Sequence, residues 1–69
     1  MQMKWVEWTE ITVGQVIHGL ESEDGSQFIF PSVNATVIHK CPKQVKIQYP
    51  FGDTEVVPTT TKFYIEENE

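Results

Sequence analysis

Two aromatic rings and a carboxylate gather around one short turn of the chain. Tyr49 and Phe51 flank Pro50, and Gly52 and Asp53 follow directly. The face of an aromatic ring attracts a cation by about 0.5–2 kcal/mol, depending on how much water is excluded. Asp53 could accept a hydrogen bond from the same cation or add negative charge. These residue types fit a receptor for a cationic side chain, and methylated lysine or arginine is the usual biological guest.

Core packing is the alternative explanation for the same rings. Tyr49 and one of Phe28 or Phe30 could simply be core residues, because aromatic side chains bury more area than any other kind. Phe51 is harder to explain in this way, since it stands at the apex of a predicted turn and turns lie on the surface. Both explanations stay open at this point, and the exposure of Phe51 distinguishes them best.

Groups that could do acid–base or metal chemistry are few. His18 and His39 could act with Asp24 or Asp53 as acid and base, since histidine titrates near neutral pH. Both histidines fall in predicted strands, however, and no serine or cysteine stands in a recognisable triad or elbow pattern. Cys41 lies in a predicted turn and fits an ordinary surface thiol. The chain has no metal-ligand spacing, so we expect a protein that is not an enzyme and takes no cofactor.

A strand, a turn and a second strand must position the aromatic pair. Residues 45–49 alternate between apolar and polar side chains, as a strand with one buried face does. Gly52 can take the positive φ that ends many hairpin loops, and residues 54–57 form the return strand. Other β-rich segments lie at 13–20, 27–30, 35–39 and 61–65, and Asp24-Gly25 is a turn signal between the first two. Five or six short strands on regular turns predict a small all-β barrel.

Length and composition limit the class of protein and of partner. Sixty-nine residues make one small domain, in which we expect any site to be a surface groove. The single cysteine excludes an internal disulfide. A net charge of −5 without any arginine argues against direct nucleic-acid binding and favours a protein or peptide of basic character. Because we find neither an apolar run of membrane-spanning length nor a signal peptide, we expect a soluble, intracellular protein without a membrane partner.

Several short motifs follow one another in an order that resembles a Tudor domain. They are Val13-Gly14, Ser22-Glu23-Asp24-Gly25, Phe30-Pro31, Ala35-Thr36-Val37 and Tyr49-Pro50-Phe51-Gly52-Asp53. The resemblance covers roughly residues 12–65 and implies a five-stranded SH3-like barrel with an aromatic cage for a cationic side chain. The chain departs from the Tudor pattern in two places. The segment 26–34 is several residues longer, and Leu20 or Glu21 stands where many Tudor cages have Trp or Tyr.

The expected binding site follows from this resemblance and from the order of the turns. The residues expected at the ligand are Tyr49, Phe51, Asp53, Phe30, Phe28 and Glu21. Asp53 would accept a hydrogen bond, and Glu21 or Glu23 would steer the approach of the ligand. In an antiparallel meander, alternate turns fall at the same end of the sheet. We therefore expect the turns at 21–26 and 50–53 to share one end and the lysine-containing turn at 40–43 to lie at the other.

Two tryptophans precede the predicted barrel. Trp5 and Trp8 lie in an N-terminal extension, residues 1–11, that we expect to pack on the barrel at 12–65, and an acidic tail follows at 66–69. The tryptophans could cap the open end of the barrel, add an edge strand or contact a partner. Capping is favoured, because an exposed pair would be a liability in a free monomer. A partner interface would consist of Trp5, Trp8, Glu23 and Asp24.

Two other functions compete with peptide binding at an aromatic pocket. The chain could be a small acidic inhibitor or adaptor, of phage or mobile-element type, that covers a basic surface of a larger protein. It could also be a structural subunit that forms a homo-oligomer through an exposed strand edge. Rings at right angles around a cavity would favour the pocket, a flat acidic face the inhibitor, and two-fold strand pairing the oligomer.

Overall fold

Eight strands and one short 3₁₀ helix make up the described part of the chain. The computed structural model describes residues 2–67. In chain order the elements are β1 (Gln2–Val6), the 3₁₀ helix η1 (Trp8–Glu10), β2 (Val16–Ile17), β3 (Gly19–Glu21), β4 (Gln27–Ile29), β5 (Ala35–Lys40), β6 (Gln44–Gln48), β7 (Thr54–Pro58) and β8 (Lys62–Glu67). The prediction of an all-β protein is confirmed.

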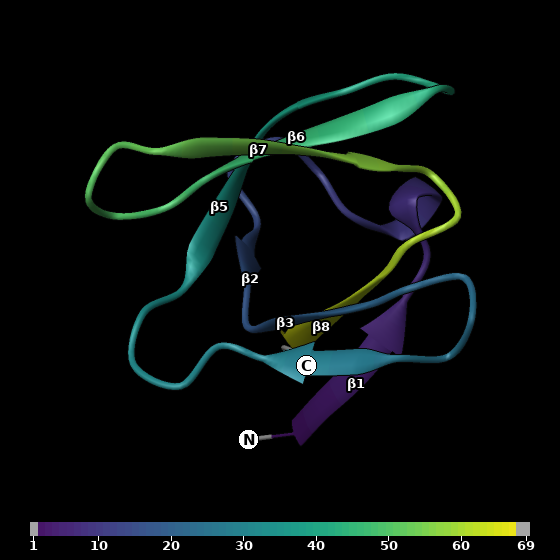
Figure 1. Ribbon diagram of the computed structural model, residues 1–69, viewed down its shortest axis with the longest axis horizontal. Coiled ribbons are helices and arrows are strands. Elements are labelled where there is room, and N and C mark those ends of the chain that lie inside the picture. Colours follow the sequence, from purple (N-terminus) through teal and green to yellow (C-terminus); the bar gives the residue numbers. More distant parts are fainter. Residues whose placement is uncertain (1, 68–69) are drawn as a thin grey trace.

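The strands form two four-stranded antiparallel sheets (Figure 1). One sheet has the order β1-β8-β3-β4, and the other has the order β2-β5-β6-β7. The chain passes from one sheet to the other between β2 and β3, which only His18 separates. The expected closed barrel of five strands is therefore not what forms: the strands make two sheets that share a corner at His18.

The prediction of one continuous strand over residues 13–20 is wrong. Gly14 has a φ of 98°, and the Gln15 backbone N–H donates to the Thr12 carbonyl over 2.9 Å, so this segment is a turn. Only glycine adopts such a φ readily. Strand structure begins at Val16 and changes sheet after Ile17.

The core lies between the inner faces of the two sheets. The alternation predicted for β6 is confirmed, because Val45 and Ile47 are fully buried while Gln48 is exposed. Phe63 of β8 is the largest fully buried side chain. The buried apolar residues are Val6, Ile11, Ile17, Phe30, Ala35, Val37, Val45, Ile47, Val57, Phe63 and Ile65.

The two ends of the described chain pair with each other. β1 runs antiparallel to β8 from Gln2 opposite Glu67 to Val6 opposite Phe63. The N-terminal extension thus contributes an edge strand to one sheet. Glu66 and Glu67, the first half of the predicted acidic tail, belong to β8, and residues 68–69 lie outside the described part.

Candidate functional site

Four aromatic side chains form a continuous row that joins the two sheets. The ring centroids of Phe28 and Phe30 are 5.6 Å apart at an interplanar angle of 69°, and those of Phe30 and Tyr49 are 5.6 Å apart at 79°. Tyr49 and Phe51 are stacked, with centroids 5.5 Å apart and planes inclined by 3°. We call Phe28, Phe30, Tyr49 and Phe51 the aromatic row. The structure thus brings together all four aromatic residues that the sequence suggested.

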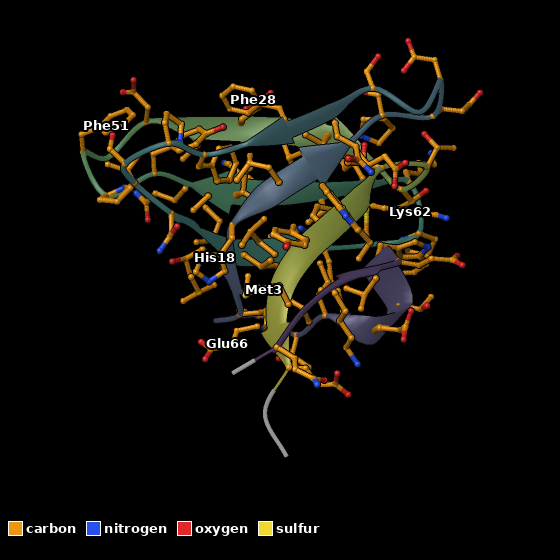
Figure 2. All side chains as sticks on the ribbon, turned by 90° about the horizontal axis from the view of Figure 1, so that it is seen from below. Met3, His18, Phe28, Phe51, Lys62 and Glu66 are labelled. Atoms are coloured by element: carbon orange, nitrogen blue, oxygen red, sulfur yellow. The ribbon has the colours of Figure 1, made fainter. Side chains whose placement is uncertain are left out.

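Exposure divides the row into a packed middle and two open ends. Phe30 is buried in the core, and Tyr49 is half-buried against it. Phe28 and Phe51 are 57% and 64% exposed, and Figure 2 shows both labelled rings at the periphery of the molecule. Core packing therefore explains Phe30 and contributes to Tyr49, but it does not explain Phe51.

A tight hairpin fixes the stacked pair. The Tyr49 backbone N–H donates to the Asp53 carbonyl over 2.8 Å, and the Gly52 N–H donates to the Tyr49 carbonyl over 2.9 Å. Gly52 has a φ of 102°, as the sequence predicted for this position. This is the pattern of a three-residue hairpin loop with a glycine bulge. It holds Phe51 at the apex of the loop and directs its ring back onto Tyr49.

Glu55 completes the site from the neighbouring strand. The Tyr49 hydroxyl donates a hydrogen bond to Glu55 Oε1 over 2.6 Å. Burial, followed by this hydrogen bond and the negative charge of Glu55, raises the pKa of Tyr49 to about 12. The sequence analysis did not name Glu55 as a site residue. The strand period of two could have identified it, because Glu55 shares a face with the buried Val57 and lies opposite Ile47, two residues before Tyr49.

The rings line an open surface and do not wall a cavity. Phe51 is parallel to Tyr49, so its outer face points to solvent and only one flat side is offered to a ligand. A hollow of about 410 Å³ lies elsewhere, lined by Thr12, Val13, Gly14, Gln15, Val16, His18 and Glu66. Figure 2 shows His18 and Glu66 there, well away from Phe51.

The expected meeting of the acidic turn with the aromatic turn does not occur. Figure 1 shows the turn after β3, which carries Glu23 and Asp24, on the opposite side of the molecule from the β6–β7 turn. The prediction did not count the connection at 31–34 when it assigned alternate turns to the two ends of the sheet. That connection is a turn in its own right, so the 50–53 turn shares its side with residues 31–34, and the acidic turn shares its side with residues 41–43. Glu21 accordingly pairs with Gln27 and Lys62 and not with the row.

Asp24 acts within its own turn. Its Oδ1 accepts a hydrogen bond from the Ser26 backbone N–H over 2.9 Å. This bond lowers the pKa of Asp24. Asp24 is fully accounted for as a turn-forming residue of this loop.

Asp53 and Glu55 are the two carboxylates that follow the turn with Tyr49 and Phe51, and Lys46 precedes Tyr49 by three residues. The segments that carry the row, residues 27–36 and 48–57, contain these two carboxylates and no lysine. Asp53 is exposed on the hairpin. These two segments therefore carry only negative charge, which attracts cations at a range that salt shortens.

The two tryptophans pack against the body of the protein. Trp5 of β1 lies opposite Tyr64 of β8, with ring centroids 4.6 Å apart, and it is half-buried. Trp8 is half-buried against the core. Lys40 Nζ lies 5.6 Å from the centroid of the Trp8 ring and donates to the Trp8 and Ile11 carbonyls. Trp5 therefore belongs to an edge strand, while Trp8 and Lys40 secure the segment that leads into the core.

The remaining candidate groups do not converge. His18 lines the hollow described above, His39 is exposed on β5, and Cys41 is a free, half-buried thiol. Within residues 2–67 no three histidine, cysteine or acidic side chains are grouped so that they could hold a metal ion. No helix in this part of the chain has the length and apolar character needed to cross a membrane.

Comparison with known proteins gave no match of any kind. No family model matches the chain, and no curated protein and no solved structure matches it.

Proposed function

We propose that this protein is a non-catalytic module that binds a basic segment of another protein at the aromatic row. A cationic side chain of the partner lies against Phe51 and Tyr49, as the resemblance to a Tudor domain with an SH3-like strand arrangement implies. One observation carries the proposal. Phe51 is 64% exposed and yet held in a fixed orientation against a second ring, beside two carboxylates.

The physical chemistry of the row supports a cationic guest. A single exposed phenylalanine needs no explanation, but stacking on Tyr49 fixes the plane of Phe51 before a ligand arrives. A cation on the outer face of Phe51 meets the negative face of the ring. Asp53 and Glu55 add longer-range attraction, and binding is therefore expected to weaken as salt is raised. Phe28, at the other end of the row, offers apolar contact to the neighbouring part of the same segment.

The openness of the row also supports the second candidate function. An acidic inhibitor or adaptor that covers a basic surface of a larger protein needs a flat face, and the exposed Phe51 ring, stacked parallel on Tyr49, offers one. The two functions differ in the size of the smallest partner that binds. A module for a single side chain binds a short peptide, whereas an inhibitor of this type needs a folded basic surface.

Calorimetric titration with short peptides tests the proposal. The probes are capped decapeptides of alternating arginine or lysine and serine, the same peptides with methylated basic side chains, and an alternating glutamate–serine control. We expect the basic peptides to bind and the acidic peptide not to bind. Phe51→Ala should weaken binding roughly 2- to 30-fold, the equivalent of about 0.5–2 kcal/mol.

Val13→Ala is the matched control. Val13 is 60% exposed, much like Phe51, but lies in the turn at 12–15 and outside the row. This variant should bind the basic peptides as the unchanged protein does. If both variants bind equally well, the row is not the binding surface. If no short basic peptide binds at all but a folded basic protein does, the inhibitor function replaces the peptide-binding one.

A further inference from the structure

Two strand edges are open on the side of the molecule where the aromatic row lies. β4 is the last strand of one sheet and β7 the last strand of the other, so each has a neighbour on one side only. In Figure 2 the ribbons of β4 and β7 overlap near Phe28, whereas Figure 1 shows the two strands apart, one in each sheet. All three residues of β4 and four of the five in β7 are exposed. Such edges present unpaired backbone groups that another strand can use.

The hairpin hydrogen bonds determine which backbone groups of β7 point outward. In an antiparallel pair, residues alternate between those that bond to the partner strand and those that bond away from it. Tyr49 bonds to Asp53, so Glu55 and Val57 also face β6, while Thr54 and Val56 face away from it. Pro58 falls in the outward set, where its missing N–H costs no hydrogen bond to β6. This agreement supports the assignment.

The same alternation applies to β4. The Ser22 N–H donates to the Ser26 carbonyl, and the Phe30 N–H donates to the His18 carbonyl. Phe28 therefore bonds to β3, and Gln27 and Ile29 present their backbone groups to solvent. The molecule thus has two open edges, each with two outward N–H groups.

Resting on the function proposed above, we propose that the basic segment binds as an added strand on the open edge of β7. Charge favours β7 over β4, because Glu55 lies in β7 and Asp53 directly before it, whereas β4 has no charged residue. The edge of β7 also leads directly into the Phe51 loop. A positively charged extended segment is complementary to this edge. A second copy of the chain, with its net charge of −5, is repelled from it.

Strand addition also determines which spacing of basic side chains the site recognises in the partner segment. Successive side chains of the added strand point to opposite faces of the sheet. One set lies on the face that Glu55 shares with Tyr49, and the other set lies beside Val56 on the outer face. The site therefore prefers segments with basic residues at every second position over segments with the same residues in a block.

Amide hydrogen exchange of the ¹⁵N-labelled protein, without and with the arginine–serine decapeptide, tests the mode of binding. The Thr54 and Val56 amides should exchange rapidly in the free protein and at least tenfold more slowly in the complex. The Glu55 and Val57 amides, which already bond to β6, should be protected in both states. The Gln27 and Ile29 amides on the other edge should not change.

Two proline variants provide an independent measurement. Val56→Pro removes one outward N–H from β7 without removing a bond to β6, and Ile29→Pro removes one outward N–H from β4. We expect Val56→Pro to weaken binding of the decapeptide at least fivefold and Ile29→Pro to leave it unchanged. Melting temperatures of both variants show whether each still folds, and the exchange experiment on the unchanged protein does not depend on them.

The outcomes separate this inference from the function on which it rests. If the peptide binds and Phe51→Ala weakens binding, but Thr54 and Val56 stay unprotected, then the row binds the partner without strand addition and the inference is wrong. Protection of Gln27 and Ile29 instead would place the strand on β4 and overturn the choice of edge. Protection of Thr54 and Val56 that grows with protein concentration alone would show a second copy on the edge. Absence of any peptide binding would overturn both proposals.

Discussion

The Tyr49 hydroxyl connects the aromatic row to a charged side chain, that of Glu55. Tyr49 packs on the core, stacks on Phe51 and donates to Glu55, so this one side chain connects the buried part of the site to the exposed part. Its ring gains packing energy, and its hydroxyl keeps a hydrogen-bond partner at the edge of the core, as partly buried tyrosines usually do. Loss of Glu55 would leave the ring in place but would free the hydroxyl.

The ionisation of Tyr49 gives a prediction at this scale. In a Tyr64→Phe background, in which Tyr49 is the remaining tyrosine, absorbance at 295 nm should report a pKa of about 12. Adding Glu55→Gln should lower this pKa, because it removes the neighbouring charge, but burial should still keep the pKa above 10.0, the ordinary value for tyrosine. A Tyr49 pKa that Glu55→Gln leaves unchanged would contradict the hydrogen bond between the two side chains.

The same shift determines how stability depends on pH. The folded-state pKa lies above the unfolded value, so the neutral phenol is favoured in the folded protein. The contribution of this group to the free energy of unfolding is fully present below pH 10. It is lost as the pH rises from about 10 through 12.

At the scale of the elements, a hairpin loop and a β-bulge determine where the strands place their side chains. The hairpin with Gly52 presents Phe51, and the β-bulge between Val37 and His39 changes the register of β5 against β6. After this irregularity Lys40 lies opposite the buried Val45, and its ammonium reaches the carbonyls of Trp8 and Ile11. This contact links the N-terminal segment to β5.

Replacing Lys40 by methionine tests that link. Hydrogen bonds from a charged group contribute about 1.5–3 kcal/mol each, and partial exposure reduces this contribution, so we expect Lys40→Met to lower the free energy of unfolding by about 1–3 kcal/mol. Lys43→Met is the control, since Lys43 is exposed on the neighbouring turn, and it should change stability by about 0.5 kcal/mol or less. Urea denaturation of the two variants measures both values. Equal stabilities would show that Lys40 does not hold the segment.

Local patterns predicted the elements well and their connections less well. The alternation of Val45, Ile47 and Tyr49 predicted β6, and Gly52 predicted the hairpin, because both follow from neighbouring residues. The break at Gly14 and the corner at His18 were not predicted, since a β-rich run does not reveal where a strand leaves one sheet for another. That choice depends on which sheet buries the side chain, which is a property of the whole fold.

At the scale of the whole molecule, the side on which each turn falls decides which charges surround the row. Because residues 31–34 form an additional turn, the turn with Glu23 and Asp24 lies on the side opposite the row. Asp53 and Glu55 remain beside the row. The four aromatic rings were nonetheless placed together correctly from sequence, since Phe28 and Phe30 immediately precede the turn that does share a side with Phe51. The candidate site thus contains all four predicted rings but not the predicted Glu21 and Glu23.

An NMR titration of the labelled protein with methylated and unmethylated lysine and arginine peptides tests the central claim most directly. We predict shifts centred on Phe28, Tyr49, Phe51 and residues 53–57, and these shifts should diminish when salt is added. Shifts centred on the hollow at residues 12–16, or on the acidic turn at 22–26, would contradict the claim. So would a titration in which the resonances of Phe51 do not move.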